Sequence, residues 1–263
     1  MERCAEVLMP GETRSVEGFG KTGQTHRADD AKTALDNLPA RLGYSARRAD
    51  PRPSAMKVLL LINLQNDFLR DGLVATPDGE SIVPLVQQLQ NQFRLVAATQ
   101  DWHPANHVNF AANHAGRQPG EIARMRRREV LLGPVHCVQG TRGAELIPSL
   151  NRDKINRIVR TGTDTNIDSF SAFFDGDRQA PTGLLDYLRE KRVTEIFLCG
   201  LGTDTTILNT ALDALGFDFE TVLIEDACRG ANPEAAAKAI EAMKDAGATM
   251  VLSRDILAWP VRR

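Results

Sequence analysis

The segment DWHPANH carries side chains that could bind a metal ion. Asp101 and His103 stand two residues apart, and His107 follows four residues later. A turn broken by Pro104 could aim all three side chains inward. His136, further along the chain, could supply a fourth ligand. One carboxylate with two or three imidazoles suits Zn²⁺, Fe²⁺ or Mn²⁺; the alternative is a surface loop with scattered histidines.

A second segment, LCGLGTDTTILN at 198–209, joins a predicted strand to a glycine-rich turn and the start of a helix. Backbone N–H groups in such a turn can stabilise an oxyanion, and Gly202 and Thr206 would form this site. A nucleophile at the position of Thr206 would have its pKa lowered by the helix dipole. The alternative is an ordinary helix start with Thr203 or Asp204 as its N-cap.

Two further polar residues follow apolar strands. Asn63 comes directly after VLLLI, and Thr161 lies at the end of the strand that precedes the loop DTNIDSFSAFFD. The carboxyl ends of strands in an open α/β sheet are the usual place for an active site. Asn63 is a neutral amide, which can hold a hydrogen-bond network together but cannot take a proton.

Short apolar runs alternate with amphipathic segments from Lys57 onward. Strands are predicted at 57–62, 94–100, 155–160, 193–199, 220–225 and 248–252, and helices near 81–93, 180–191, 204–216 and 233–246. This alternation predicts a mostly parallel sheet with helices on both faces. A long excursion at 101–150 interrupts the pattern, and loops of that length are usually functional.

Residues 1–55 differ in composition from the rest of the chain. They mix charges of both signs with Gly, Pro and Ser and contain no long apolar run. We expect a disordered extension here, followed by a single domain at 56–263. Without an apolar h-region the segment is not a signal peptide. Met56 directly precedes the first strand, so a true start at Met56 stays open beside a functional tail.

The overall composition excludes several classes of function. The net charge of -2 gives no basic field for nucleic acid or an anionic membrane. No apolar run approaches the roughly 20 residues that span a bilayer. Cys4, Cys137, Cys199 and Cys228 form no CxxC pair, a pattern that suits the reducing cytoplasm and argues against a disulfide scaffold.

Six short stretches together resemble the nicotinamidase/pyrazinamidase branch of the isochorismatase-like hydrolases. They are LQNDF, DWHPANH, PVHC, DSFSAFFD, GLGTD and DACRG, in the order of that family. The resemblance implies a three-layer α/β/α domain with a doubly wound sheet. It also implies a divalent metal that holds the pyridine nitrogen of nicotinamide, and an Asp–Lys–Cys triad whose thiolate attacks the carboxamide and releases ammonia, as in NAD salvage.

The matching positions keep the metal set of that family but not its triad. By motif, Asp101, His103 and His136 fall on the metal ligands, with His107 as a fourth ligand or water-holder. The triad falls on Asn63, Thr161 and Thr206.

The pocket walls of the family fall on Phe68, Gly133 and Phe170. Gly133 stands where the family usually has an aromatic residue, so the pocket is expected to be enlarged.

These substitutions predict little turnover by the family mechanism. Thr206 would need an adjacent base, and Asn63 cannot serve as one. Asn63, Thr161 and Thr206 are expected to satisfy one another as a neutral hydrogen-bonded cluster. Rescue by Arg160, Cys199 or Cys137 is less favoured, since Arg160 should face the other side of its strand.

Three functional hypotheses follow. The favoured one is a metal-binding, catalytically impaired or inactive homologue that binds a nicotinamide-like or other carboxamide. The second is an active amide or ester hydrolase that uses metal-bound water or a different nucleophile. The third is a structural subunit of an active paralogue, and a homo-oligomer is also compatible with the sequence.

Overall fold

The computed structural model describes residues 55–125, 128–176, 178 and 180–260. All of them belong to one compact unit. The expectations for residues 1–54 lie outside the described part of the chain. None of the described helices is long and apolar enough to cross a membrane.

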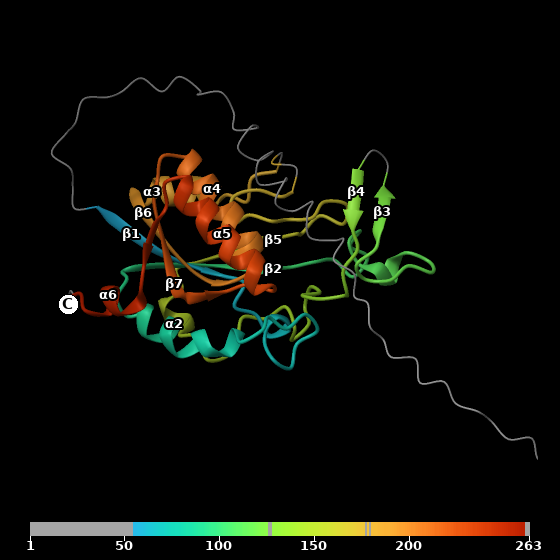
Figure 1. Ribbon diagram of the computed structural model, residues 1–263, viewed down its shortest axis with the longest axis horizontal. Coiled ribbons are helices and arrows are strands. Elements are labelled where there is room, and N and C mark those ends of the chain that lie inside the picture. The colour runs from blue at the N-terminus through green and yellow to red at the C-terminus, as the bar shows by residue number, and fades with distance from the viewer. Residues whose placement is uncertain (1–54, 126–127, 177, 179, 261–263) are drawn as a thin grey trace, which may run out of the picture. The chain divides into compact units, whose positions relative to one another are not determined.

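A six-stranded parallel sheet forms the centre of the domain (Figure 1). Its strands run in the order β5-β2-β1-β6-β7-β8, and every neighbouring pair is parallel. Their bounds are β1 Met56–Ile62, β2 Leu95–Asp101, β5 Arg157–Thr161, β6 Val193–Leu201, β7 Glu220–Arg229 and β8 Thr249–Val251. This confirms the mostly parallel sheet and all six strands predicted from the sequence.

Helices cover both faces of the sheet, which confirms the three-layer α/β/α fold. On one face lie α2 (Val83–Leu89) and α6 (Ser253–Leu257), which contact each other and β7. On the other face lie α3 (Leu184–Glu190), α4 (Leu208–Gly216) and α5 (Pro233–Asp245) (Figure 1).

The start of α5 shows how local chemistry fixes a helix end. The Asn232 side chain accepts a hydrogen bond from the N–H of Ala235 at 2.9 Å. Pro233 follows at the first helical position, where its missing N–H costs nothing.

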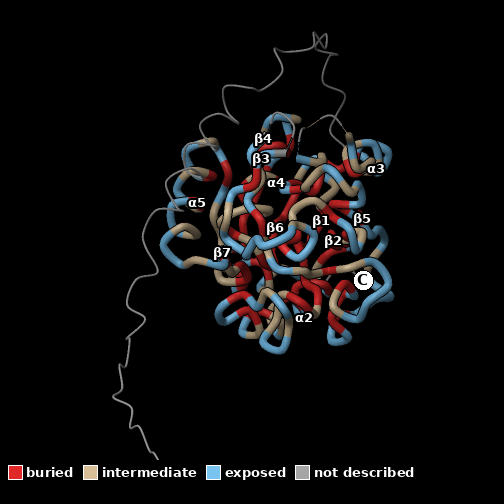
Figure 2. The backbone as a smooth tube through the Cα atoms, turned by 90° about the vertical axis from the view of Figure 1, so that its right-hand side faces the viewer, coloured by how far each residue is buried: buried red, intermediate tan, exposed pale blue. Residues whose placement is uncertain are grey.

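The strand β1 lies at the centre of the core because it is apolar on both faces. Residues 58–62 are fully buried, as expected for a central strand of a parallel sheet. Figure 2 shows the buried backbone concentrated along the central strands, with exposed residues on the covering helices and loops. From β1 the chain first adds β2 and β5 on one side and then β6, β7 and β8 on the other. The order therefore switches at β1, and ligand crevices open at such a point.

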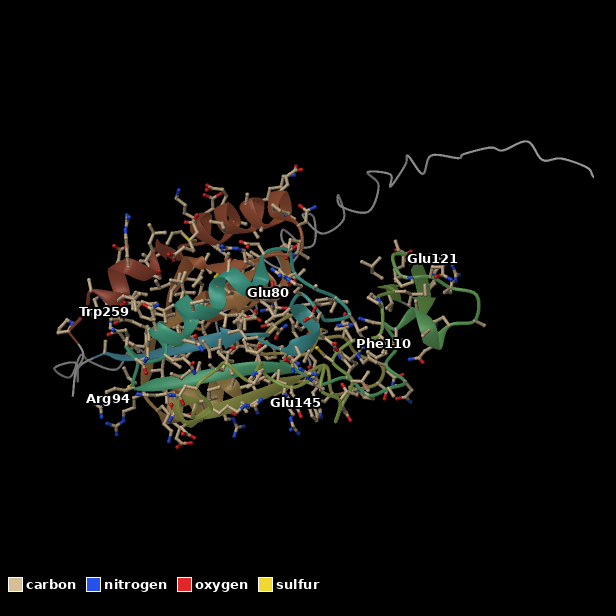
Figure 3. All side chains as sticks on the ribbon, turned by 90° about the horizontal axis from the view of Figure 1, so that it is seen from below. Glu80, Arg94, Phe110, Glu121, Glu145 and Trp259 are labelled. Atoms are coloured by element: carbon tan, nitrogen blue, oxygen red, sulfur yellow. The ribbon has the colours of Figure 1, made fainter. Side chains whose placement is uncertain are left out.

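The carboxyl ends of four strands converge at that switch point. Asn63 follows β1, Asp101 ends β2, Thr161 ends β5, and Gly202 follows β6. Figure 3 shows Phe110 and Glu121 beyond this end of the sheet, and Arg94 and Trp259 at the opposite end.

Two strands and one α-helix of the described chain were not predicted from the sequence. The excursion contains an antiparallel hairpin of β3 (Ile122–Met125) and β4 (Arg128–Leu131). The short helix α6 follows β8.

Candidate metal centre and ligand site

Asp101 is the buried carboxylate at the centre of the site, with 8% of its surface exposed. The side chain of Gln65 fixes its backbone from both directions. The Gln65 amide donates to the carbonyl oxygen of Asp101 at 2.8 Å and accepts from the N–H of Asp101 at 2.8 Å. A residue of the LQNDF segment therefore fixes the backbone of Asp101 at the end of β2.

His103 and His136 each turn a ring nitrogen toward this carboxylate. The Nδ1–H of His103 donates to the carbonyl of Gly162 at 3.0 Å, and the Nδ1–H of His136 donates to the carbonyl of Pro134 at 2.9 Å. Carbonyl oxygens only accept, so each Nδ1 is the donor, and the neutral form of each ring has its lone pair on Nε2.

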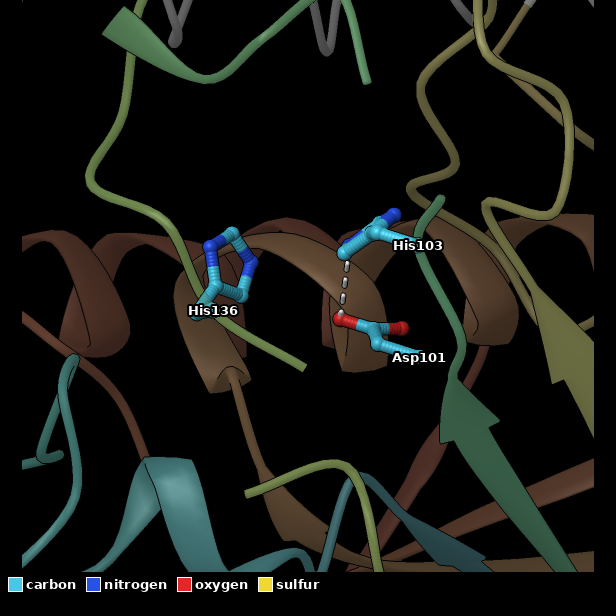
Figure 4. A group of neighbouring side chains, drawn as sticks. All are labelled: Asp101, His103 and His136. Atoms are coloured by element: carbon cyan, nitrogen blue, oxygen red, sulfur yellow. Dashed lines mark ion pairs between the residues drawn. The ribbon is translucent and has the colours of Figure 1, made fainter. Parts of the chain in front are cut away.

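The three side chains form one cluster that could hold a cation (Figure 4). Nε2 of His103 lies 4.0 Å from Oδ2 of Asp101. One ligand atom from each of Asp101, His103 and His136 lies within 4.8 Å of the others. Burial lowers the pKa of His103, which favours the neutral imidazole that binds metals. A carboxylate with two free imidazole nitrogens fits Zn²⁺, Fe²⁺ or Mn²⁺.

His107 lies beside this cluster but is not part of it. Its ring centre is 4.5 Å from that of His103. Its Nε2 contacts the carbonyl of Ile167 at 3.2 Å, and its Nδ1 accepts from the N–H of Asn109 at 3.3 Å. Both ring nitrogens are thus engaged by the backbone. Burial lowers the pKa of His107 to about 4, so the ring is neutral. His107 lies outside the three-residue cluster, and its role as a fourth ligand or water-holder stays a prediction.

Phe110 supports the histidines and was missed in the sequence. It is fully buried, and its ring centre lies 5.7, 5.5 and 5.6 Å from those of His103, His107 and His136. An apolar ring at this position shields the cluster from water and restrains the imidazole rings. Its apolar type gave no chemical signal in the sequence.

Asn63 and Thr161 converge on Asp101 and not on each other. The hydroxyl of Thr161 donates to Oδ1 of Asp101 at 2.8 Å, and Nδ2 of Asn63 donates to Oδ2 at 3.3 Å. The expected neutral cluster of Asn63, Thr161 and Thr206 is therefore wrong. Both residues donate to the Asp101 carboxylate, because a hydrogen bond to an ionised acceptor is stronger than one between neutral groups. The sequence alone indicated only hydrogen bonds among Asn63, Thr161 and Thr206.

The turn before α4 brings Thr206 to the same edge of the sheet. Thr203–Ile207 forms a single π-helical turn, and Gly202 precedes it with φ of 84°. A Cβ added at Gly202 would lie 3.5 Å from the Thr206 hydroxyl, so the two groups proposed for the oxyanion-binding turn are neighbours.

The N-cap expected at Thr203 or Asp204 is wrong. Gly202 is the N-cap residue, without a side-chain cap bond. Asp204 instead accepts from the N–H groups of Ala231 and Asn232 at 3.2 and 3.1 Å. The buried hydroxyl of Thr203 has no partner among the described residues.

The three residues expected to line the pocket differ in how they are placed. Phe68 packs edge-on against His136, with ring centres 5.8 Å apart. Phe170 is 43% exposed. A Cβ added at Gly133 would meet only the carbonyl of Asn109, at 3.9 Å, so this position has room for a side chain.

None of the described thiols is prepared for nucleophilic attack. Cys137, Cys199 and Cys228 are free and buried. Burial raises the pKa of all three, that of Cys228 to about 12. The thiolate is the reactive form, so these groups are held in their inert state.

Arg160 is also turned away from the site. It stacks over Trp102 at 4.1 Å and donates to the side chain of Gln100 at 3.3 Å. This agrees with the expectation that Arg160 faces the other side of its strand.

Asp168 is a second carboxyl near the metal cluster, and the sequence gave it no role. Its pKa is raised to about 6, chiefly by burial, and the charge of Asp101 acts in the same direction. The N–H of Ser169 donates to its carboxyl at 2.8 Å. The signal that could have found it is its place at the start of DSFSAFFD.

Comparisons with known proteins identify the family of the chain. Residues 57–255 match the isochorismatase domain. The chain is 40% identical over 205 residues to a nicotinamidase of Escherichia coli, covering 76% of this chain and 96% of that protein. It is 33% identical over 193 residues to a protein of Arabidopsis thaliana named "probable inactive nicotinamidase", covering 72% of this chain and 88% of the relative.

Solved structures show the same fold. A nicotinamidase/pyrazinamidase of Acinetobacter baumanii superposes with a TM-score of 0.73 at 38% identity, covering 78% of this chain and all of that one. A pyrazinamidase of Pyrococcus horikoshii in complex with zinc superposes with a TM-score of 0.62 at 32% identity, covering 74% of this chain and 98% of that one. The chain belongs to the isochorismatase family, within its nicotinamidase branch.

Proposed function

We propose that this chain binds a divalent metal and a small carboxamide such as nicotinamide, and that it is a catalytically silent member of its family. The observation that carries the proposal is the set of side chains at the strand ends. Asn63, Thr161 and Thr206 offer one amide and two hydroxyls, where the family resemblance leads us to expect an acid, an amine and a thiol.

The chemistry of these three groups argues against hydrolysis by the family route. The Thr206 alcohol needs a neighbouring base, and the amide of Asn63 is neither basic nor free, because its Nδ2 is bound to Asp101. Catalytic groups that act as a unit are not additive, and loss of one can cost on the order of 10⁶ in rate. Three losses leave at most the roughly 10³-fold advantage over water that binding and an oxyanion site provide.

Asp101, His103 and His136 would hold the metal. When bound there, a divalent ion supplies a Lewis acid that can accept a lone pair from the ligand. Phe68, packed edge-on against His136, offers an aromatic surface beside that position. The zinc complex of the pyrazinamidase neighbour supports Zn²⁺ as the first ion to test. The relative named "probable inactive nicotinamidase" supports a silent member of this family.

Nicotinamide binding can be measured without any turnover. At about 100 times its Kd a ligand stabilises the folded state by about 2.7 kcal/mol. For a domain of this size that corresponds to a rise in Tm of roughly 5–10 °C. We expect this shift when nicotinamide is added to the zinc-loaded protein in a thermal unfolding experiment.

Two controls make the result specific. Benzamide, which lacks the ring nitrogen, should give a smaller shift, and Phe68→Ala should lose the nicotinamide shift while keeping the shift caused by zinc. A zinc shift without any nicotinamide shift, at concentrations up to the millimolar range, would contradict carboxamide binding.

A hydrolase of bulkier amides or esters is the second candidate, favoured by the open space at Gly133. Hydrolysis from a panel of such substrates, lost in Asp101→Ala and after chelation, would support it over the silent protein.

A further inference from the structure

We propose that Asn63, Thr161 and Thr99 are positioning residues for Asp101, and that they fix which of its two oxygens faces the histidines. The inference rests on the metal site of the proposed function. It goes beyond that site because it gives these three residues a role in metal affinity. The observation behind it is a chain of buried hydrogen bonds that ends at the carboxylate.

Thr161 occupies one oxygen of Asp101. Its hydroxyl is buried, with 2% of the residue exposed, and lies 2.8 Å from Oδ1. An ionised carboxylate only accepts, so the hydroxyl must be the donor. A charge-assisted bond of this kind is stronger than a neutral one and holds Oδ1 away from the cluster. The other oxygen, Oδ2, is the one that lies 4.0 Å from Nε2 of His103.

Asn63 restrains the second oxygen, Oδ2, and Thr99 sets the orientation of the Asn63 amide. The Thr99 hydroxyl accepts the N–H of Asn63 at 3.0 Å and donates its proton to Oδ1 of Asn63 at 2.6 Å. Because the amide oxygen is taken, the amide nitrogen must face Asp101, where it lies 3.3 Å from Oδ2. Thr99 is fully buried, so water does not compete for these bonds.

The backbone at residue 63 agrees with this role. Asn63 has φ of 50°, in the left-handed region that Asn tolerates better than most residues with a side chain. An Asp at this position would suit the backbone equally, but with Thr161 in place of a cation it would put an uncompensated second carboxylate about 3.3 Å from Oδ2 and offer no donor. Asn63, Thr99 and Thr161 are neutral, so Asp101 is the one charged group among these four residues that a cation would meet.

The test compares zinc affinity in matched variants. Thr161→Val removes the donor and keeps the shape, and we expect it to raise the zinc Kd by about 10–100-fold, as loss of an outer partner of a metal ligand typically does. Thr161→Ser keeps the donor and should bind within about threefold of wild type. Kd is measured by competition with a chelator of known affinity. The visible spectrum of the Co²⁺-loaded protein reports whether the coordination changes.

Thr221→Val is the matched control, because Thr221 is also buried and its hydroxyl contacts the carbonyl of Phe219 at 3.2 Å in β7, away from the site. It should leave Kd and the Co²⁺ spectrum unchanged. Asn63→Gly is an independent variant, since Gly accepts the positive φ and removes the amide. We expect it to weaken zinc binding by about tenfold.

Equal zinc affinity and equal Co²⁺ spectra in Thr161→Val, Asn63→Gly and Thr221→Val would overturn the positioning role while leaving the metal site intact. Failure of the wild-type protein to bind zinc, cobalt, iron or manganese would overturn both the positioning role and the proposed function. If Thr161→Val does not fold, the comparison of Asn63→Gly with Thr161→Ser decides.

Discussion

The triple substitution Asn63→Asp, Thr161→Lys and Thr206→Cys is expected to increase nicotinamide hydrolysis by about 10³-fold or more. The physical reason is that a base, an ammonium group and a thiol are restored just after β1, at the end of β5 and in the turn after β6, three strands whose carboxyl ends lie at one edge of the sheet. The expected size follows from the loss of about 10⁶ that the reverse change can cause in a catalytic unit, reduced because the surroundings stay unadjusted. Ammonia release from the zinc-loaded protein is the measurement.

The single variants are the controls for this gain. Thr206→Cys alone should gain less than about tenfold, because a thiol without a base remains mostly protonated at neutral pH. Adding Gly133→Trp to the triple variant should raise activity further, since the position has room for a side chain. A folded, zinc-binding triple variant without any gain would show that the three positions are assigned wrongly.

Weaker zinc binding after removal of a metal ligand is the second large effect that we expect. Asp101→Ala and His103→Ala should each weaken zinc binding by at least about 100-fold, more than the loss of an outer partner would cause. The loss is large because only three groups in the described part of the chain form the cluster. Zinc content after gel filtration, and competition with a chelator, provide the measurement.

His114→Ala is the matched control for His103→Ala. His114 lies in the same excursion, but its Nε2 contacts the carbonyl of Val108 at 2.7 Å and it is not in the cluster. Its loss should leave zinc binding within about threefold of wild type. Equal zinc binding by His103→Ala and His114→Ala would place the metal elsewhere or show that none binds.

The elements that the sequence predicted well are those with a strong apolar pattern. The strand β1 is buried throughout residues 58–62, so its run of apolar residues is unambiguous. The end of β7 was placed too early, because Glu225 and Asp226 interrupt the apolar pattern while the strand continues to Arg229. The hairpin of β3 and β4 was missed because its strands are short and rich in charged residues.

The candidate site was predicted in its residue types but only partly in its partners. Asp101, His103 and His136 come together as expected, and this is encoded in their motifs. The hydrogen bond of Nε2 of His107 depends on the carbonyl of Ile167, which lies 60 residues further along the chain. The pairing of Thr161 with Asp101 likewise depends on strand register, which places the two residues opposite each other on β5 and β2. Such contacts between distant backbone segments leave no pattern in a single sequence.

The central claim is that the strand ends hold a metal and a ligand but no working nucleophile. Its most direct test is the release of ammonia from nicotinamide by the zinc-loaded wild-type protein, with Asp101→Ala as the background. We expect no release above that background at enzyme concentrations in the micromolar range. Release at an ordinary enzymatic kcat, on the order of 1–10³ s⁻¹, would contradict the claim.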